Sequence, residues 1–270
     1  MRNLQSPLNE SRLEFEEIMN CFEAIESSRS LHMQSKHIFS HSFYSHSKHL
    51  KEIVEKFREK VKMIDNAPIF NGIYVQIGAS FEKFIRTSTS SYLEEISKNF
   101  SKYEDLPPKI KNGNLYFTGK LFAQVHTPPS GRSIDFSEYS KRIGTCIDGE
   151  KSFQLNHDAF SMFLGNCTSE KLEKHFDKIS IVNYWQKISK KTKIQTALNT
   201  KKFKETEKEC TLKVDEYIKN RNAIAHRGEN FKIINPSDIR EYISFFKCLM
   251  EQTTDLLIEE SEKHTKKPVK

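Results

Sequence analysis

The apolar residues of this chain recur with helical spacing over much of its length. Stripes with i, i+3, i+4, i+7 spacing predict helices over about 9–34, 47–65 and 69–97. A polar stretch rich in serine and histidine, residues 35–49, separates the first two. The third helix follows Pro68 and has the most apolar face, which predicts that it is the central core helix. Its stripe consists of Phe70, Ile73, Tyr74, Ile77, Phe81, Phe84 and Ile85.

The central part of the chain, residues 99–166, lacks this continuous periodicity. It contains turn-type clusters such as Pro107–Pro108 and Asn112–Asn114. We therefore expect a loop-rich insertion here. Residues 115–122 are compatible with a short strand pair, and residues 158–164 with a short helix.

Helical patterning resumes in the second half of the chain. Thr168 is a suitable N-cap for a helix over about 169–178. A longer helix is expected over about 202–227, with Gly228 as the residue that ends it.

The last helix has the clearest boundary signals. Asn235 suits the N-cap, Pro236 suits the first helical position, and Asp238 places an acid in the first turn. These residues predict a helix over about 236–262. The charged residues 264–270 are expected to fray beyond it.

The length of the chain allows one large domain or two small ones. Either arrangement can bury a sufficient core without a metal or disulfides. We assign residues 1–263 to a single all-α domain. The cysteines are scattered and form no C-x-x-C pair, which favours a reducing compartment. They are Cys21, Cys146, Cys167, Cys210 and Cys248.

Charge and hydropathy limit the class of partner. The formal net charge is +7 and the pI is about 9.0, which favours an anionic partner such as a nucleic acid. The start of the chain has no apolar signal segment, and no stretch approaches the roughly 18 apolar residues of a membrane span. We therefore expect a soluble cytoplasmic protein that makes no contact with a membrane.

The long helix over 202–227 carries an arginine in the middle of its apolar stripe. At about 100° per residue, Arg221 lies on the same side as Val214, Tyr217 and Ile218. An arginine keeps its charge when it is buried. Arg221 must therefore meet an acid, line a solvated cleft or face an oligomer interface.

Two further polar residues flank this arginine. Asn222 and His226 are four residues apart, so they lie on adjacent turns of one helix face, beside the apolar stripe. A purely structural explanation is also open at this point. Arg221 could form a buried ion pair, and His226 could interact favourably with the helix dipole near its C-terminal end.

The spacing of these residues resembles the signature of the HEPN superfamily, an arginine and a histidine separated by four to six residues with a polar residue after the arginine. The surrounding segment, residues 214–228, is similar to the RiboL-PSP branch of these domains. An earlier helix of the same type stands at residues 73–86. The resemblance covers about residues 68–97 and 200–260.

This resemblance implies a HEPN-like up-and-down helical bundle and a homodimer with the active site at its interface. It also implies a metal-independent endoribonuclease without a cofactor, in which Arg221, Asn222 and His226 are catalytic. In the cell, such an enzyme would be a toxin or an antiphage defence effector that cleaves RNA, with an antitoxin or a defence protein as its partner.

The residue types suit this chemistry. RNA supplies its own nucleophile, the 2′-OH, so cleavage needs a proton acceptor, a proton donor and positive charge at the phosphorane. His226 can accept or donate a proton, Arg221 can supply the charge, and Asn222 can orient the phosphate or the histidine. One histidine cannot serve both ends of the reaction, which favours a second copy across a dimer axis.

Three other residues receive supporting roles. Glu82, on the flank of the third predicted helix, is a candidate partner for Arg221, although it could equally be a solvated surface acid. Lys219 and Arg227, beside the motif, are expected to contact RNA.

Two other groups of residues carry weaker signals. Five histidines lie within residues 32–49, but no cysteine or acid accompanies them at ligand spacing, so we expect no metal site. A run of lysines between 187 and 204 could contact successive phosphates of a nucleic acid or form a solvated helix face. These lysines are Lys187, Lys190, Lys191, Lys193, Lys201, Lys202 and Lys204.

Two alternatives to the enzyme remain open. The chain could be a catalytically inactive HEPN-like module that binds RNA or a protein. It could also be a dimerising scaffold in which Arg221 and His226 have structural roles only.

Overall fold

The computed structural model describes residues 2–38, 67–124, 135–147, 152–226 and 234–265, together with a few isolated positions between 52 and 59. Every regular element in these residues is a helix. The all-α prediction is therefore confirmed. The predicted helix over 47–65 falls largely outside the described residues.

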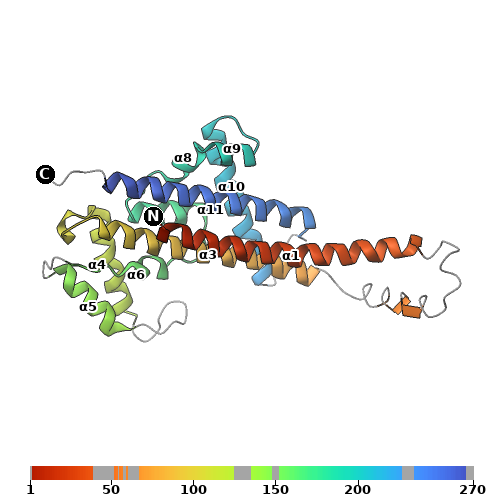
Figure 1. Ribbon diagram of the computed structural model, residues 1–270, viewed down its shortest axis with the longest axis horizontal. Coiled ribbons are helices and arrows are strands. Elements are labelled where there is room, and N and C mark those ends of the chain that lie inside the picture. The colour runs from red at the N-terminus through yellow and green to blue at the C-terminus, as the bar shows by residue number, and fades with distance from the viewer. Residues whose placement is uncertain are drawn as a thin grey trace.

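Three long helices form the body of the molecule. They are α1 (Arg2–Ile38), α3 (Ala67–Lys98) and α11 (Pro236–Thr265), and they run side by side along its longest dimension (Figure 1). α3 packs against both of the others, so it is the central core helix that its apolar stripe predicts. Its Phe81, Phe84 and Ile85 are fully or almost fully buried.

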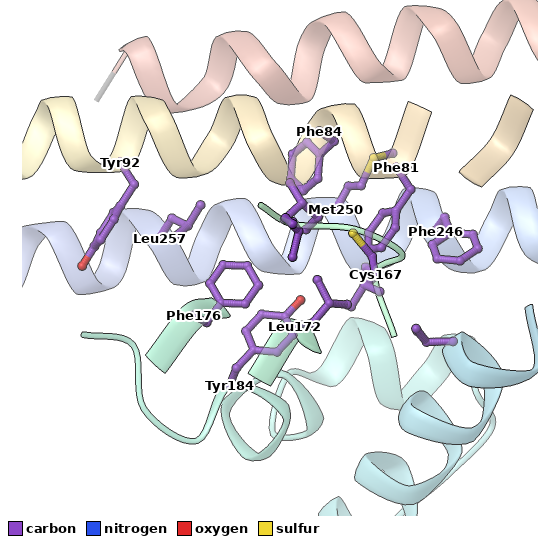
Figure 2. Close-up of a cluster of buried hydrophobic side chains, with 14 of the residues drawn as sticks. Phe81, Phe84, Tyr92, Cys167, Leu172, Phe176, Tyr184, Phe246, Met250 and Leu257 are labelled. Atoms are coloured by element: carbon purple, nitrogen blue, oxygen red, sulfur yellow. The ribbon is translucent and has the colours of Figure 1, made fainter. Parts of the chain in front are cut away.

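Four further helices cover α3 and α11. They are α7 (Ser169–Lys178), α8 (Tyr184–Ser189), α9 (Thr192–Ala197) and α10 (Phe203–Ala225). Aromatic side chains fill the space between this layer and the long helices, as Figure 2 shows. The rings of Phe176 and Tyr184 stack with centroids 4.1 Å apart, and the Tyr184 hydroxyl hydrogen-bonds Thr253 of α11 at 2.8 Å. α7 and α8 are thereby fixed on the core.

Most of the described residues within 99–166 are helical, so the prediction of a loop-rich insertion is wrong. It holds a 3₁₀ turn (Tyr103–Asp105), α4 (Pro108–Phe122), α5 (Phe136–Ile147) and α6 (His157–Met162). The expected strand pair over 115–122 lies within α4 and is also wrong. The short helix expected over 158–164 is present as α6.

The residues that suggested turns have other roles in α4. Pro108 occupies the first turn, where its missing N–H is no loss. Gly113 lies against Phe160 of α6 so closely that a Cβ atom would stand 2.5 Å from the ring. The glycine therefore serves close packing between two helices instead of a turn.

Asparagine side chains join these central helices through a buried polar network. Asn114 accepts a hydrogen bond from the backbone N–H of Asn156 at 2.9 Å. The Asn156 amide in turn donates to Thr118 and to the Tyr139 carbonyl, both at 3.0 Å. Buried polar groups need such partners, so the network holds α4, α5 and α6 in one arrangement.

Several predicted boundaries shift by a few residues. α1 starts earlier than expected and contains Pro7, and α11 continues to Thr265, so the expected fraying point at 264 is still helical. α7 begins as predicted, with the Thr168 hydroxyl accepting a hydrogen bond from the Lys171 N–H. α10 ends at Ala225, two residues before the predicted end, and the expected last residue Gly228 lies outside the described residues.

The helices that the structure describes include none that is long and apolar enough to cross a lipid bilayer.

Candidate functional site

α10 approaches α3 closely at one glycine. A Cβ atom on Gly78 would stand 2.8 Å from the Tyr217 hydroxyl, so only a glycine allows this separation. The Tyr217 hydroxyl donates a hydrogen bond to the carbonyl of Tyr74, one turn earlier on α3. The ring of Tyr217 also packs on that of Tyr74, with centroids 4.5 Å apart. These contacts fix the register between the two helices.

This register brings Arg221 to Glu82. Each residue lies one turn beyond the contact between Gly78 and Tyr217, on its own helix. Arg221 Nη2 is 3.7 Å from Glu82 Oε2, and the two side chains are 19% and 12% exposed. Glu82, the candidate partner, thus lies beside Arg221 in the structure, so this arginine meets an acid.

A second contact to Arg221 comes from the loop between α6 and α7. Arg221 Nη1 donates a hydrogen bond of 2.8 Å to the side-chain oxygen of Asn166. Arg86 of α3 donates to the Leu164 carbonyl in the same loop at 3.3 Å and lies 3.9 Å from Glu82. Two arginines and one acid thus anchor the loop.

Asp215 ties the end of this loop to α10. Its carboxylate accepts hydrogen bonds from the backbone N–H of Ser169 at 2.8 Å and from the Ser169 hydroxyl at 2.5 Å. Trp185 of α8 donates its indole N–H to the Ser169 carbonyl at 2.8 Å. The loop that carries Asn166 is therefore fixed by hydrogen bonds before and after this residue.

Asn222 and His226 lie at the open end of the same helix. The Asn222 side-chain oxygen is 3.4 Å from Arg221 Nη1. His226 is the C-cap of α10, and its backbone N–H donates to the Asn222 carbonyl at 3.0 Å. Its side chain is exposed. The Arg221 and Asn222 side chains are thus hydrogen-bonded to each other. The imidazole of His226 is exposed to solvent one turn after Asn222.

The other predicted site residues differ in how far the structure describes them. Lys219 is exposed on α10, two residues before Arg221. Arg227 lies outside the described residues, as do the side chains of the five histidines within 32–49. Within the part of the chain that is described, no three histidine, cysteine or acidic side chains are grouped as metal ligands.

Cys167 lies fully buried beside the charged cluster. Burial raises the pKa of its thiol well above the usual range, and the negative charge of Glu82 raises it further. Only a thiolate attacks efficiently, so the buried Cys167 contributes packing. Its position between α3, α7 and α11 is visible in Figure 2.

A polar cavity of about 480 Å³ adjoins the cluster on the other side of Arg86. Lys83, Arg86 and Ser90 line it from α3, and Asp158 lines it from α6. None of Arg221, Asn222 and His226 lines this cavity. The motif therefore lies at the exposed end of α10, outside this cavity.

The sequence did not indicate Asn166 and Arg86 as members of this cluster. Arg86 lies one turn beyond Glu82, so its membership follows from helical spacing once Glu82 is paired with Arg221. Asn166 comes from a loop with no periodic pattern, and only the fold brings it to α10.

The described residues thus form an all-helical fold with an arginine and a histidine at the end of one helix. A family model described as RiboL-PSP-HEPN matches residues 43–259, which is most of the chain. The chain belongs to this family, and its superfamily has nuclease and RNA-related roles. No curated protein and no solved structure matches the chain.

Proposed function

We propose that this protein is a metal-independent endoribonuclease that uses Arg221, Asn222 and His226. The observation that carries the proposal is the arrangement at the end of α10. A guanidinium group is held in place by Glu82 and Asn166, and an exposed imidazole lies one turn further along the helix. Phosphodiester cleavage requires a positive charge that stabilises the phosphorane and a group that can accept or donate a proton.

The reaction starts with attack of the ribose 2′-OH on the adjacent phosphorus. His226 accepts the 2′-OH proton as the new O–P bond forms, and Arg221 stabilises the negative charge of the phosphorane. The bond to the 5′-oxygen then breaks, and that oxygen takes a proton from a protonated imidazole. The products are a 2′,3′-cyclic phosphate and a free 5′-OH. Asn222 orients the phosphate through its side-chain amide.

The second imidazole in this scheme belongs to another copy of the chain, so the enzyme is a homodimer with one composite active centre. Mixing wild-type protein with an excess of His226→Ala protein tests this arrangement. Activity per wild-type chain should fall as mixed dimers form, because each mixed dimer has one imidazole. Unchanged activity per wild-type chain would contradict a shared centre.

The biological role proposed for this activity is that of a toxin or an antiphage effector in the cytoplasm. An enzyme that cleaves RNA without a metal has no cofactor through which the cell could control it. A neutralising antitoxin or a defence partner protein would supply that control. The buried free thiols of Cys146, Cys167 and Cys210 are compatible with a reducing compartment.

The test is incubation of the purified full-length protein with RNA in EDTA. We expect cleavage, products that end in 2′,3′-cyclic phosphate, and resistance of a 2′-O-methyl RNA of the same sequence, because that RNA lacks the nucleophile. Cleavage of the 2′-O-methyl RNA, or products with a 5′-phosphate, would contradict attack by the 2′-OH. Absence of cleavage would favour the second candidate.

The second candidate is a HEPN-like module that binds RNA or a protein without cleaving it. The observation that favours it is that Arg221 is already paired with Glu82 and Asn166 within one chain. In that case Arg221 serves the fold, and Arg221→Ala would lower stability while any RNA binding by the folded protein would remain.

A further inference from the structure

The lysines between 187 and 204 fall into two groups in the structure. Lys187 pairs with Glu260 at 2.8 Å, Lys191 pairs with Glu259, and Lys193 lies 3.7 Å from Glu251. All three acids belong to α11. These three lysines therefore connect the segment around α8 and α9 to α11.

The second group consists of Lys190, Lys201, Lys202 and Lys204. All four are exposed, and none forms an ion pair with an acid among the described residues. Together with Gln195 they surround Phe203, the first residue of α10, in a hollow of about 470 Å³. The Lys190 ammonium group lies 6.0 Å from the centre of the Phe203 ring.

Phe203 is unusual in this setting. The residue is 41% exposed, whereas most of the phenylalanines that the structure describes are buried or half-buried. An exposed aromatic ring among unpaired lysines has no packing role that would explain it. Exposed apolar surface rimmed by polar groups is typical of a binding site.

We propose that Phe203 and the four unpaired lysines form a binding site for single-stranded RNA, which we call the Phe203 patch. This inference rests on the proposed function and names its substrate class. One unpaired base stacks on the Phe203 ring, and the lysines contact the flanking phosphates.

The chemistry of the patch selects a single strand. Stacking on an aromatic ring needs a base with a free face, which a duplex offers only at its ends. Lysine ammonium groups neutralise phosphates without reading sequence. The patch should therefore bind unpaired RNA with little dependence on its sequence.

The patch and the motif lie at opposite ends of α10. The helix has 23 residues, so they are separated by about 33 Å at a rise of 1.5 Å per residue. Phe203 thus takes no part in the chemistry at His226. Changes in the patch should alter the affinity for RNA and leave the rate of the bound complex unchanged.

The experiment measures binding in His226→Ala protein, so that cleavage does not interfere. A fluorescently labelled, unstructured RNA of about 20 nucleotides is titrated with the full-length protein at several salt concentrations. Phe203→Ala should weaken binding about tenfold and leave the salt dependence unchanged, because it removes stacking and no charge. Phe203→Trp should restore binding.

Two lysine pairs provide matched variants with the same change in charge. Lys201→Gln with Lys202→Gln removes two unpaired lysines and should lower the slope of log K against log salt by about 1.4. Lys191→Gln with Lys193→Gln removes two lysines that pair with α11 and should leave the slope nearly unchanged. Equal effects of the two pairs would overturn the patch, because only general charge would then matter.

A duplex RNA of the same length separates stacking from charge. Phe203→Ala should leave duplex binding unchanged. The proposal is overturned if the Phe203→Ala protein binds the single strand as tightly as the parent protein. It is also overturned if the substitution weakens binding of the duplex as much as binding of the single strand. These outcomes are independent of cleavage: loss of binding in the Phe203→Ala variant would support the patch even if the wild-type protein cleaved nothing.

Discussion

At the scale of single residues, Arg221 determines how the site is built. It sits among apolar neighbours on α10, and its charge is compensated by Glu82 and by the oxygens of Asn166 and Asn222. A charge that is mostly withdrawn from water needs such partners. The position of Glu82 was predictable, because helical spacing places it on the flank of an apolar stripe. The position of Asn166 was not, because a loop has no periodicity to follow.

Removing one member of the Arg221–Glu82 pair should cost stability. We expect Arg221→Gln to lower the free energy of unfolding by about 2 kcal/mol, below the range for fully buried pairs, because both side chains are partly exposed and Arg86 still faces Glu82. The double variant with Glu82→Gln should lose about 1 kcal/mol less than the sum of the two single changes. Urea unfolding of the four proteins measures this coupling, and strictly additive losses would refute it.

At the scale of helices, the contact between α3 and α10 positions the motif. Gly78 lets Tyr217 approach, and the next turn of each helix then brings Arg221 to Glu82. The sequence predicted both helices but not their separation. From the sequence alone, a glycine within a helix indicates only lower helix stability. Its role in close packing becomes visible in the three-dimensional structure.

Two glycines of α3 test this contact against each other. Gly78→Ala places a methyl group 2.8 Å from the Tyr217 hydroxyl and should destabilise the protein by about 1–3 kcal/mol through overpacking. Gly72→Ala, on the same helix, meets no atom within 4 Å and should stabilise it by about 0.5–1 kcal/mol through helix propensity. Thermal unfolding distinguishes the two, and equal effects would show that the close approach is absent.

α7 makes the stability of the protein depend on pH. His175 of α7 is 5% exposed and hydrogen-bonds Thr89 of α3 at 2.8 Å. Burial and, to a smaller extent, the nearby positive charge of Lys178 together lower the pKa of its imidazole from 6.5 to about 4. The unfolded chain therefore takes up this proton at a higher pH than the folded protein does.

The consequence is a loss of stability in acid. The contribution of His175 should be constant above about pH 6.5 and fall between pH 6.5 and 4, by at most about 1.4 kcal/mol per pH unit. His175→Gln does not titrate, so the difference between wild type and variant isolates this effect. Parallel curves for the two proteins in urea unfolding across this range would exclude it.

Tertiary contacts between helices also explain why the sequence did not predict the helices within residues 99–166. Gly113 and Asn114 suggested a turn, but the glycine packs against Phe160 and the asparagine serves a buried network with Asn156. In an isolated segment, both residue types favour a turn. Tertiary contacts overrode these preferences, which single-sequence reasoning cannot anticipate.

At the scale of the whole molecule, the described helices pack against one another and leave the end of α10 exposed. α1, α3 and α11 supply the core (Figure 1), and α10 carries both the partly buried Arg221 and the exposed His226. The fold therefore gives the two residues different surroundings. Arg221 contacts Glu82 and Asn166 within the fold, and the side chain of His226 is exposed.

The most direct measurement is the rate of RNA cleavage in EDTA by wild-type and His226→Ala proteins. Because His226 is exposed and caps α10 through its backbone, the variant should fold and unfold as the wild type does. Its cleavage rate should fall by about 10²–10⁴, the usual contribution of a general acid or base. Equal rates for the two folded proteins would contradict the account.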